Sequence, residues 1–182
     1  MFINTIRKAL TTDSGMHCVW DFSSFASVKD FDSWEEQLLE DRDILEHIRR
    51  GSLVPININS DGAFEFEMRI GTIESHQQLT ERERKYLTVS SEKYRLVSNG
   101  SVCISGIEYV CNNLDENIGE LRIPRGTYSA TVHLIAWDDE PNMKKADGTP
   151  KNEALPDFVI IVNPEIDGES YRVDINTFPA SN

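Results

Sequence analysis

Histidine and cysteine are the residue types in this chain best suited to nucleophilic or metal chemistry. They are few and widely separated, at His17, His47, His76, His133, Cys18, Cys103 and Cys111. A nucleophilic triad needs a hydroxyl or thiol beside a base and a carboxylate, and the chain has no GxSxG elbow. Pairing of a histidine with Cys18 or Cys103 through the fold stays open. Zinc requires clustered ligands, so we expect no catalytic residue, no metal ion and no cofactor.

Acidic side chains suggest two further kinds of chemistry. Asp138, Asp139 and Glu140 directly follow a predicted strand, and Asp147-Gly148 lies in the same polar segment, 138–156. This spacing does not match an EF-hand, so a solvated acidic loop is the simpler interpretation and a calcium site the alternative. Two carboxylates on adjacent strands also suffice for glycoside hydrolysis, which keeps a hydrolase open as a third possibility.

The overall charge narrows the class of partner. The 182 residues carry 31 acids against 18 bases, a net charge of −13. Such a field repels nucleic acid and anionic membranes and speeds encounter with a basic partner. The phosphate-binding patterns GxxxxGK[ST] and GxGxxG do not occur. We therefore expect a protein partner, no nucleic acid and no membrane, while a homo-oligomer stays possible.

Residues 32–50 read DSWEEQLLEDRDILEHIRR and predict one amphipathic helix. Ser33 and Glu36 fit a capping box, and Gly51 follows as a C-terminal stop. Steps of 100° per residue place an apolar stripe on one side and an acidic stripe on the other. The apolar stripe comprises Trp34, Leu38, Leu45 and Ile48, and the acidic stripe comprises Asp32, Glu36, Glu40 and Asp43.

The acids of this segment account for more than half of the net charge. Residues 30–46 contain eight acids and one base, which leaves a net charge of −7. A solvated helix face is the ordinary interpretation of such a segment. Like charges four residues apart, as at Glu36 and Glu40, nevertheless destabilise a helix slightly. Concentrated acid without countercharge is also what an inhibitor of a basic, nucleic-acid-handling enzyme needs.

Most of the remaining chain alternates with a period of two, which is typical of half-buried strands. We expect hairpins over 53–70 and 94–106, the second at Asn99-Gly100, with Pro55 marking an edge strand. The other expected elements are a long strand at 126–137, a central strand at 158–162, a last strand at 171–175 and a short helix or turn at 80–86.

These elements together predict a mainly β fold, an antiparallel β-sandwich with one amphipathic acidic helix near the N-terminus. A chain of this length fits one domain, 1–182, in which the helical segment 32–50 packs on a β-sandwich spanning 52–176. Three widely spaced cysteines indicate a reducing compartment. The sequence has no signal-peptide pattern at its start and no apolar run long enough to span a membrane, so we expect a cytoplasmic location.

Residues 52–163 resemble bacterial β-sandwich proteins of the toxin-immunity kind, which include the competence-associated nuclease inhibitor. The shared pattern is an IxIPxGxYxVxVY run. The residues that match it are Ile123, Pro124, Gly126, Tyr128 and Val132. These positions are mainly structural, and residues 1–50 lie outside the resemblance. The resemblance implies immunity or inhibition and identifies no toxin.

Charge and resemblance together predict an immunity protein, not an enzyme, that binds and inhibits a cognate bacterial toxin. The toxin is expected to be basic and of the nuclease type. A carbohydrate- or ligand-binding β-sandwich module is the alternative, and it should present an aromatic-lined concave face. The residues predicted to bind the partner are Asp32, Glu36, Glu40 and Asp43 on the helix and Trp137, Asp138, Asp139 and Glu140 beyond the long strand.

Overall fold

The fold was analysed in a computed structural model that describes residues 5–179. The strands are β1 Thr5–Thr12, β2 Met16–Asp21, β3 Leu53–Asn57, β4 Gly62–Ile70, β5 Leu87–Ser90, β6 Tyr94–Ser98, β7 Ser101–Gly106, β8 Gly119–Arg122, β9 Gly126–Ile135 and β10 Phe158–Pro164. The helices are α1 Phe31–Leu38, α2 Asp41–Arg50 and α3 Glu81–Lys85, with 3-10 turns η1 Phe22–Phe25, η2 Ile107–Tyr109 and η3 Trp137–Asp139.

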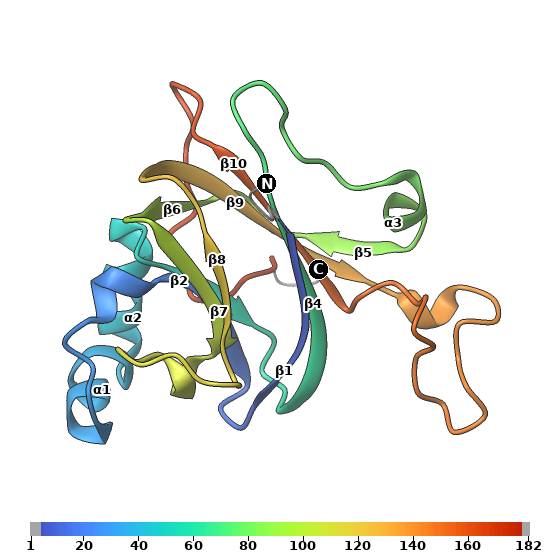
Figure 1. The fold of residues 1–182 in the computed structure, drawn as a ribbon, viewed down its shortest axis with the longest axis horizontal. Helices are drawn as coiled ribbons and strands as arrows, with labels where there is room; N and C mark the ends of the chain where they lie inside the picture. Colours follow the sequence, from blue (N-terminus) through green and yellow to red (C-terminus); the bar gives the residue numbers. More distant parts are fainter. Residues whose placement is uncertain (1–4, 180–182) are drawn as a thin grey trace.

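The strands form two sheets, which confirms the prediction of a mainly β fold (Figure 1). The large sheet has the order β1-β4-β10-β9, and both β5 and β6 pair with the far side of β9. The small sheet has the order β3-β2-β7-β8. β3 is therefore an edge strand, as Pro55 predicts, because proline cannot donate a ladder hydrogen bond.

The main core contains buried side chains from both sheets. Trp20 and Ile104 come from the small sheet, and Phe66, Val132 and Ile160 come from the large sheet. All five are at most 1% exposed. A second, smaller cluster around Val159 and Ile161 covers the other face of the large sheet. β10 is thus buried on both faces between β4 and β9, as its unbroken apolar run predicts.

The prediction of a purely antiparallel arrangement is wrong at one place. β10 runs parallel to β4, with Phe158 opposite Phe66 and Val162 opposite Ile70. Parallel neighbours need a long connection, and here residues 71–157, including β5 to β9, lie between the two strands. Periodicity within a strand gives its buried face but not the direction of its partner.

Both predicted hairpins are wrong, because their strands belong to different sheets. β3 pairs with β2 while β4 pairs with β1, and β6 pairs with β9 while β7 pairs with β2. At the second crossover, the buried Asp21 carboxylate accepts hydrogen bonds from the backbone N–H and the side-chain amide of Asn99, at 2.7 and 2.9 Å. Asp21 therefore fixes the Asn99-Gly100 turn, which connects β6 of the large sheet to β7 of the small sheet.

The predicted helix over 32–50 is two helices. Its first part is capped by Asp30, which forms a capping box with Ser33 in place of the predicted Ser33–Glu36 pair. Glu40 is extended, with φ −95° and ψ 137°, and breaks the helical run before α2. α2 ends at Gly51 in the left-handed conformation, with φ +79°, as the sequence predicts. The break lets Ile44 and Ile48 of α2 become buried.

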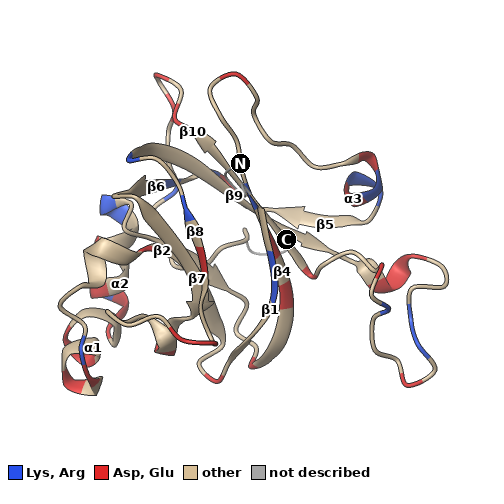
Figure 2. Ribbon diagram, viewed as in Figure 1, with Lys and Arg blue, Asp and Glu red and all other residues tan. Residues whose placement is uncertain are grey.

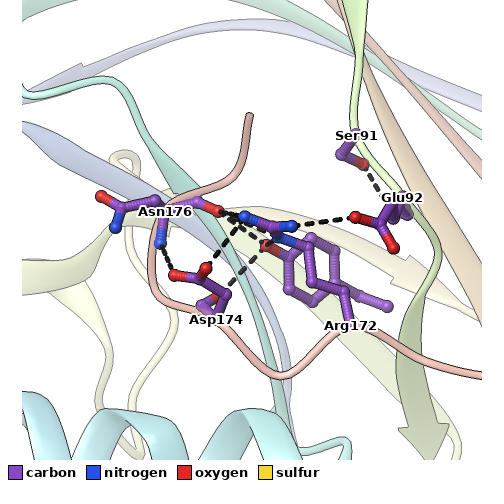
Figure 3. A network of polar contacts seen from close by, with 6 residues as sticks. Ser91, Glu92, Arg172, Asp174 and Asn176 are labelled. Carbon is purple, nitrogen blue, oxygen red and sulfur yellow. Dashed lines mark hydrogen bonds and ion pairs between the residues drawn. The ribbon is translucent and has the colours of Figure 1, made fainter. Parts of the chain in front are cut away.

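Residues 171–175 form no strand, contrary to the prediction. They begin a segment, residues 171–178, that we call the strap. Arg172 of the strap donates hydrogen bonds to Tyr94 Oη and to the backbone oxygen of Asn176, and it forms ion pairs with Glu92 and Asp174 (Figure 3). Because the strap bonds to side chains and single carbonyls, it forms no regular ladder of backbone hydrogen bonds with a neighbouring strand. Alternation of residue types in the sequence does not distinguish such a segment from a strand.

The strap also protects the edge of the small sheet. The hydroxyl of Thr177, which is fully buried, donates to the carbonyl of Pro55 at 2.9 Å and accepts from the N–H of Asn57 at 2.8 Å. Ile175 and Phe178 pack against the main core. The strap thus joins β6 of the large sheet to β3 of the small sheet and satisfies edge groups that would otherwise attract another strand.

Candidate protein-interaction surface

Helices α1 and α2 lie together at one end of the long axis of the molecule (Figure 1). Leu38 of α1 and Ile44 and Ile48 of α2 are buried in the main core. Of the predicted partner-binding acids on these helices, Asp32, Glu36 and Glu40 are exposed, while Asp43 is half-buried. Packing of the apolar stripes therefore fixes the helices and turns most of the acidic stripe toward solvent, even though the single helix is broken.

Acids colour parts of α1 and α2 red in Figure 2, and bases colour one end of α2 blue. The three bases of α2 are already engaged with acids of the same helix. Arg42 lies 3.5 Å from Asp43, and Arg49 and Arg50 both bind Glu46 at the other end of α2. Within the described residues, no ion pair is formed by Asp32, Glu35, Glu36, Glu40 or Asp41.

Two large apolar side chains lie exposed among these acids. Phe31 is 67% exposed and Leu39 is 53% exposed. The ring of Phe31 stacks on the ring of Trp34, with centroids 6.1 Å apart and planes at 11°. Trp34 is fixed by the hydrogen bond from its Nε1 to the carbonyl of Ile107 at 2.9 Å. We define the acidic surface as Phe31, Asp32, Glu35, Glu36, Leu39, Glu40 and Asp41.

Sequence reasoning missed Phe31 and Leu39. Phe31 precedes the predicted start of the helix at residue 32, and Leu39 falls outside the apolar stripe of a continuous helix. The i, i+3 spacing of Phe31 and Trp34, which places both on one helix face, is the signal that identifies the first. The position of Leu39 outside the stripe is the signal that identifies the second.

The second predicted binding region lies at the opposite end of the long axis (Figure 1). Trp137 is half-buried against the second cluster, and its Nε1 donates to Asp157 at 2.8 Å. Glu140 accepts two close hydrogen bonds from Arg82, at 2.8 and 2.7 Å, which lower the pKa of this carboxyl. Asp138 binds Lys144 at 3.2 Å, and Asp139 is exposed. These four residues are not part of the acidic surface, and two of their three acids are paired.

A serine–histidine pair lies on the outer face of the large sheet. Ser90 Oγ is 2.8 Å from His133 Nδ1, and burial lowers the pKa of His133 to about 4. The nearby Glu83 carboxylate instead accepts hydrogen bonds from Arg69 and from the Thr80 N–H, both at 2.7 Å. His133 therefore lacks the carboxylate that orients the base of a Ser-His-Asp triad.

The cysteine thiols are free. Cys18 and Cys103 are fully buried, and burial raises the pKa of both thiols. A thiol held in its protonated form is a weak nucleophile at neutral pH. Cys111 is partly exposed, and its sulfur lies 2.9 Å from the carbonyl of Asn113. The structure thus brings no histidine into hydrogen-bond contact with Cys18 or Cys103.

Acidic loop residues do not converge on a shared point. Asp147 accepts hydrogen bonds from the N–H and the hydroxyl of Thr149 at 3.0 and 2.7 Å, which closes a local turn. In residues 5–179, no group of three or more His, Cys, Asp or Glu side chains is arranged to hold a metal ion. No helix in this same range is long and apolar enough to cross a membrane.

Two solved structures resemble this fold. The protein described as "Crocagin biosynthetic gene J" is 16% identical, with a TM-score of 0.61, over 89% of this chain and 97% of that chain. ComJ from Bacillus subtilis, described as an inhibitor of the DNA-degrading activity of NucA, is 12% identical, with a TM-score of 0.48, over 91% and 99%. No family model and no curated protein matches the sequence. The first likeness shows a shared fold, and we draw no functional conclusion from either.

Proposed function

We propose that this protein is a cytoplasmic β-sandwich immunity protein that binds and inhibits a basic toxin of the nuclease type, without catalysis of its own. The observation that carries the proposal is the acidic surface, where Phe31 and Leu39 lie exposed among acids that have no ion-pair partner in the described residues. A solvated helix face would account for the acids. It gives no reason to place a stacked aromatic ring and a leucine in water beside them.

Charge and apolar contact have separate roles in such a complex. Uncompensated acids attract a positively charged active site over several ångströms and raise the association rate. Buried aromatic and aliphatic anchors near the centre of an interface supply most of the affinity. Phe31 is suited to this role because Trp34 and its hydrogen bond to Ile107 hold the ring in position before binding, which reduces the entropy lost on association.

A second copy of this chain is a less suitable occupant of the acidic surface. Both copies would carry a net charge of −13, and apposed acidic surfaces would repel each other. A basic partner would instead be attracted to the acidic surface. The charge on a nucleic-acid-handling active site is positive because it must attract phosphate, so a nuclease presents the complementary surface.

The test is co-expression and binding with the toxin encoded beside this chain in its genome. The variant Asp32→Asn/Glu36→Gln/Glu40→Gln is expected to associate at least tenfold more slowly and to lose most of its salt dependence. The control Asp61→Asn/Glu81→Gln/Asp167→Asn changes net charge by the same amount at three exposed sites elsewhere, and it should leave association nearly unchanged. Equal slowing by both variants would show that net charge alone matters, and failure to bind or protect would reject the function.

A further inference from the structure

A groove of about 680 Å³ lies on the large sheet where β4 and β10 end and β9 begins, toward the top of Figure 1. No residue of α1 or α2 lines it, and the proposed inhibitor role does not use it. Its volume falls within the range of about 300–1,000 Å³ typical of small-molecule sites. The side chains that form its apolar walls are Ile70, Ile73, Ile123, Pro124, Tyr128 and Pro164.

The walls of the groove are held in place before any ligand binds. Tyr128 is buried, and its hydroxyl donates to the carbonyl of Pro124 at 2.9 Å, which fixes the turn between β8 and β9. The N–H of Gly71 bonds to Val162 at 2.8 Å, and the N–H of Glu165 bonds to Thr127 at 3.0 Å. Three separate segments are thus tied together around one concavity.

Exposed apolar area is concentrated at the same place. Ile73 is 81% exposed, the highest value among the large hydrophobic side chains of the described residues. Ile70 and Ile123 are almost fully buried beside it, so the groove has a firm apolar floor and an uncovered rim. Contiguous apolar surface of this kind generally marks a binding site.

Two arginines without ion-pair partners add a charge preference. Seven of the eleven arginines form ion pairs, and Arg84, Arg95, Arg122 and Arg125 form none within residues 5–179. Of these four, Arg122 and Arg125 line the groove. Arg125 donates from Nε to the carbonyl of Asn99 at 3.1 Å, which leaves its terminal nitrogens available. Glu74 and Glu165 also line the groove, and the Glu165 carboxylate already accepts a hydrogen bond from Tyr171 at 2.9 Å.

We propose that this groove binds a small amphipathic anion, with an apolar body against the isoleucine and proline side chains and a carboxylate on Arg122 and Arg125. The guanidinium group matches a carboxylate in shape and charge, and it bonds most strongly when both groups leave water together. Glu74 and Glu165 balance the charge of Arg122 and Arg125 in the lining, so the groove has no net positive field of its own. The ligand is therefore selected by short-range contact with these two side chains.

The test uses three probes that share one apolar body and differ in charge. Naphthalene-1-acetate is the anion, 2-(1-naphthyl)ethanol the neutral analogue and 1-naphthylmethylammonium the cation. Titration calorimetry on the full chain should show the anion binding at least tenfold more tightly than the alcohol, with the cation weakest. Amide shifts should change at 70–74 and 122–128. No saturable binding of the anion at millimolar concentration, or equal affinity for all three probes, would overturn the proposal.

Variants separate the two parts of the site. Arg122→Gln/Arg125→Gln should lower affinity for the anion to that of the alcohol and leave alcohol binding unchanged. Gly126→Leu should weaken both, because a Cβ at Gly126 meets only the Tyr128 ring at 3.7 Å, an ordinary contact, and the larger side chain occupies the groove. Lys145→Gln, a charge change in the exposed 138–156 loop, is the control and should alter neither affinity.

The outcome is independent of the proposed inhibitor function. Neutralising Asp32, Glu36 and Glu40 should leave the affinities for the three probes within about twofold, because none of those acids lines the groove. If the Arg122→Gln/Arg125→Gln variant keeps its melting temperature and still binds the anion tightly, the arginines do not bind the carboxylate and the proposal is rejected.

Discussion

The ring of Phe31 stacks on the ring of Trp34 at 6.1 Å, although Phe31 is 67% exposed. Trp34 makes the structural contacts of this pair, since it packs on the core and hydrogen-bonds to Ile107. Phe31 adds little to folding because most of its surface stays in water. Substitution of Phe31 can therefore test its proposed role in binding without disturbing the contacts that Trp34 makes with the core.

Replacement of Phe31 by alanine is expected to cost the complex with the cognate toxin about 2 kcal/mol or more, as truncated interface anchors do. The free energy of unfolding should change by less than about 0.5 kcal/mol, because the residue is exposed. Binding kinetics and urea unfolding measure the two effects. Ile166→Ala, at an exposed apolar residue elsewhere on the surface, is the control and should affect neither. Undiminished toxin affinity in Phe31→Ala would show that Phe31 is not the anchor of the interface.

Replacement of Arg172 by methionine should release the strap. The change keeps the apolar stem but removes hydrogen bonds to Tyr94 and Asn176 and two ion pairs (Figure 3). We expect a loss of about 1–2 kcal/mol in the free energy of unfolding. Local hydrogen exchange should also quicken at the Asn57 N–H, which donates to Thr177.

The control for the strap is Arg84→Met, which removes a charge from an exposed residue whose side chain donates a hydrogen bond to the carbonyl of Leu79. It should change stability by less than about 0.5 kcal/mol. Exchange at Asn57 that is equally slow in both variants would show that other contacts hold the strap.

Sequence patterns predict correctly those elements that are determined by residues close together in the sequence. The apolar run of β10, the polar alternation of β9 and the stop at Gly51 each depend on neighbouring residues, and these predictions hold. α3, at 81–85, also lies inside the predicted helix or turn at 80–86. The 138–156 segment contains only the short turn η3 and one isolated bridge between Lys144 and Pro150, in agreement with a long loop.

Pairing between distant segments is what the sequence does not reveal. Asn99-Gly100 has the chemistry of a hairpin turn, yet Asp21, 78 residues away, binds Asn99 and makes the turn a crossover. Glu40 likewise breaks a favourable helical pattern because Ile44 and Ile48 gain burial in the core. The groove escapes notice for the same reason, since Ile73 follows a strand of the large sheet, Arg122 ends a strand of the small sheet, and only the packing of the two sheets brings them together.

Replacement of Asp21 by alanine should therefore destabilise the protein strongly. The carboxylate is fully buried and accepts hydrogen bonds from Ser24 as well as from Asn99. Its loss leaves the part-buried N–H of Asn99 without this partner and removes the bonds to Ser24, a cost of about 2–4 kcal/mol in total. Urea unfolding measures this loss, and Asp13→Ala at an exposed turn is the control. A small effect at Asp21 would mean that water replaces the carboxylate.

Thiol labelling should distinguish the three cysteines in the native protein. Cys18 and Cys103 are fully buried with raised thiol pKa values, whereas Cys111 is partly exposed. Ellman's reagent should therefore modify one thiol per chain at pH 8 and all three in concentrated urea. The variant Cys111→Ser should remove the native reaction. Native labelling of two or more thiols would show that the core opens readily.

Protonation of His133 is expected to make the protein less stable in acid. Burial lowers the pKa of His133 from its ordinary 6.5 to about 4, so the unfolded chain binds the proton more readily between these values. The stabilisation is fully present above about pH 6.5 and is lost as the pH falls toward 4. It amounts to about 2 kcal/mol, after allowance for the part of the ring that remains in water.

His133→Gln removes the titration and allows a hydrogen bond to Ser90 to be kept. Its free energy of unfolding, measured in urea from pH 7 to pH 4, should fall less steeply than that of the unmodified protein. His17 and His47 also have pKa values lowered by burial, so a residual slope should persist in the variant. His76→Gln, at an exposed position, should follow the unmodified protein throughout. Parallel curves for His133→Gln and the unmodified protein would show that His133 is not the group that titrates.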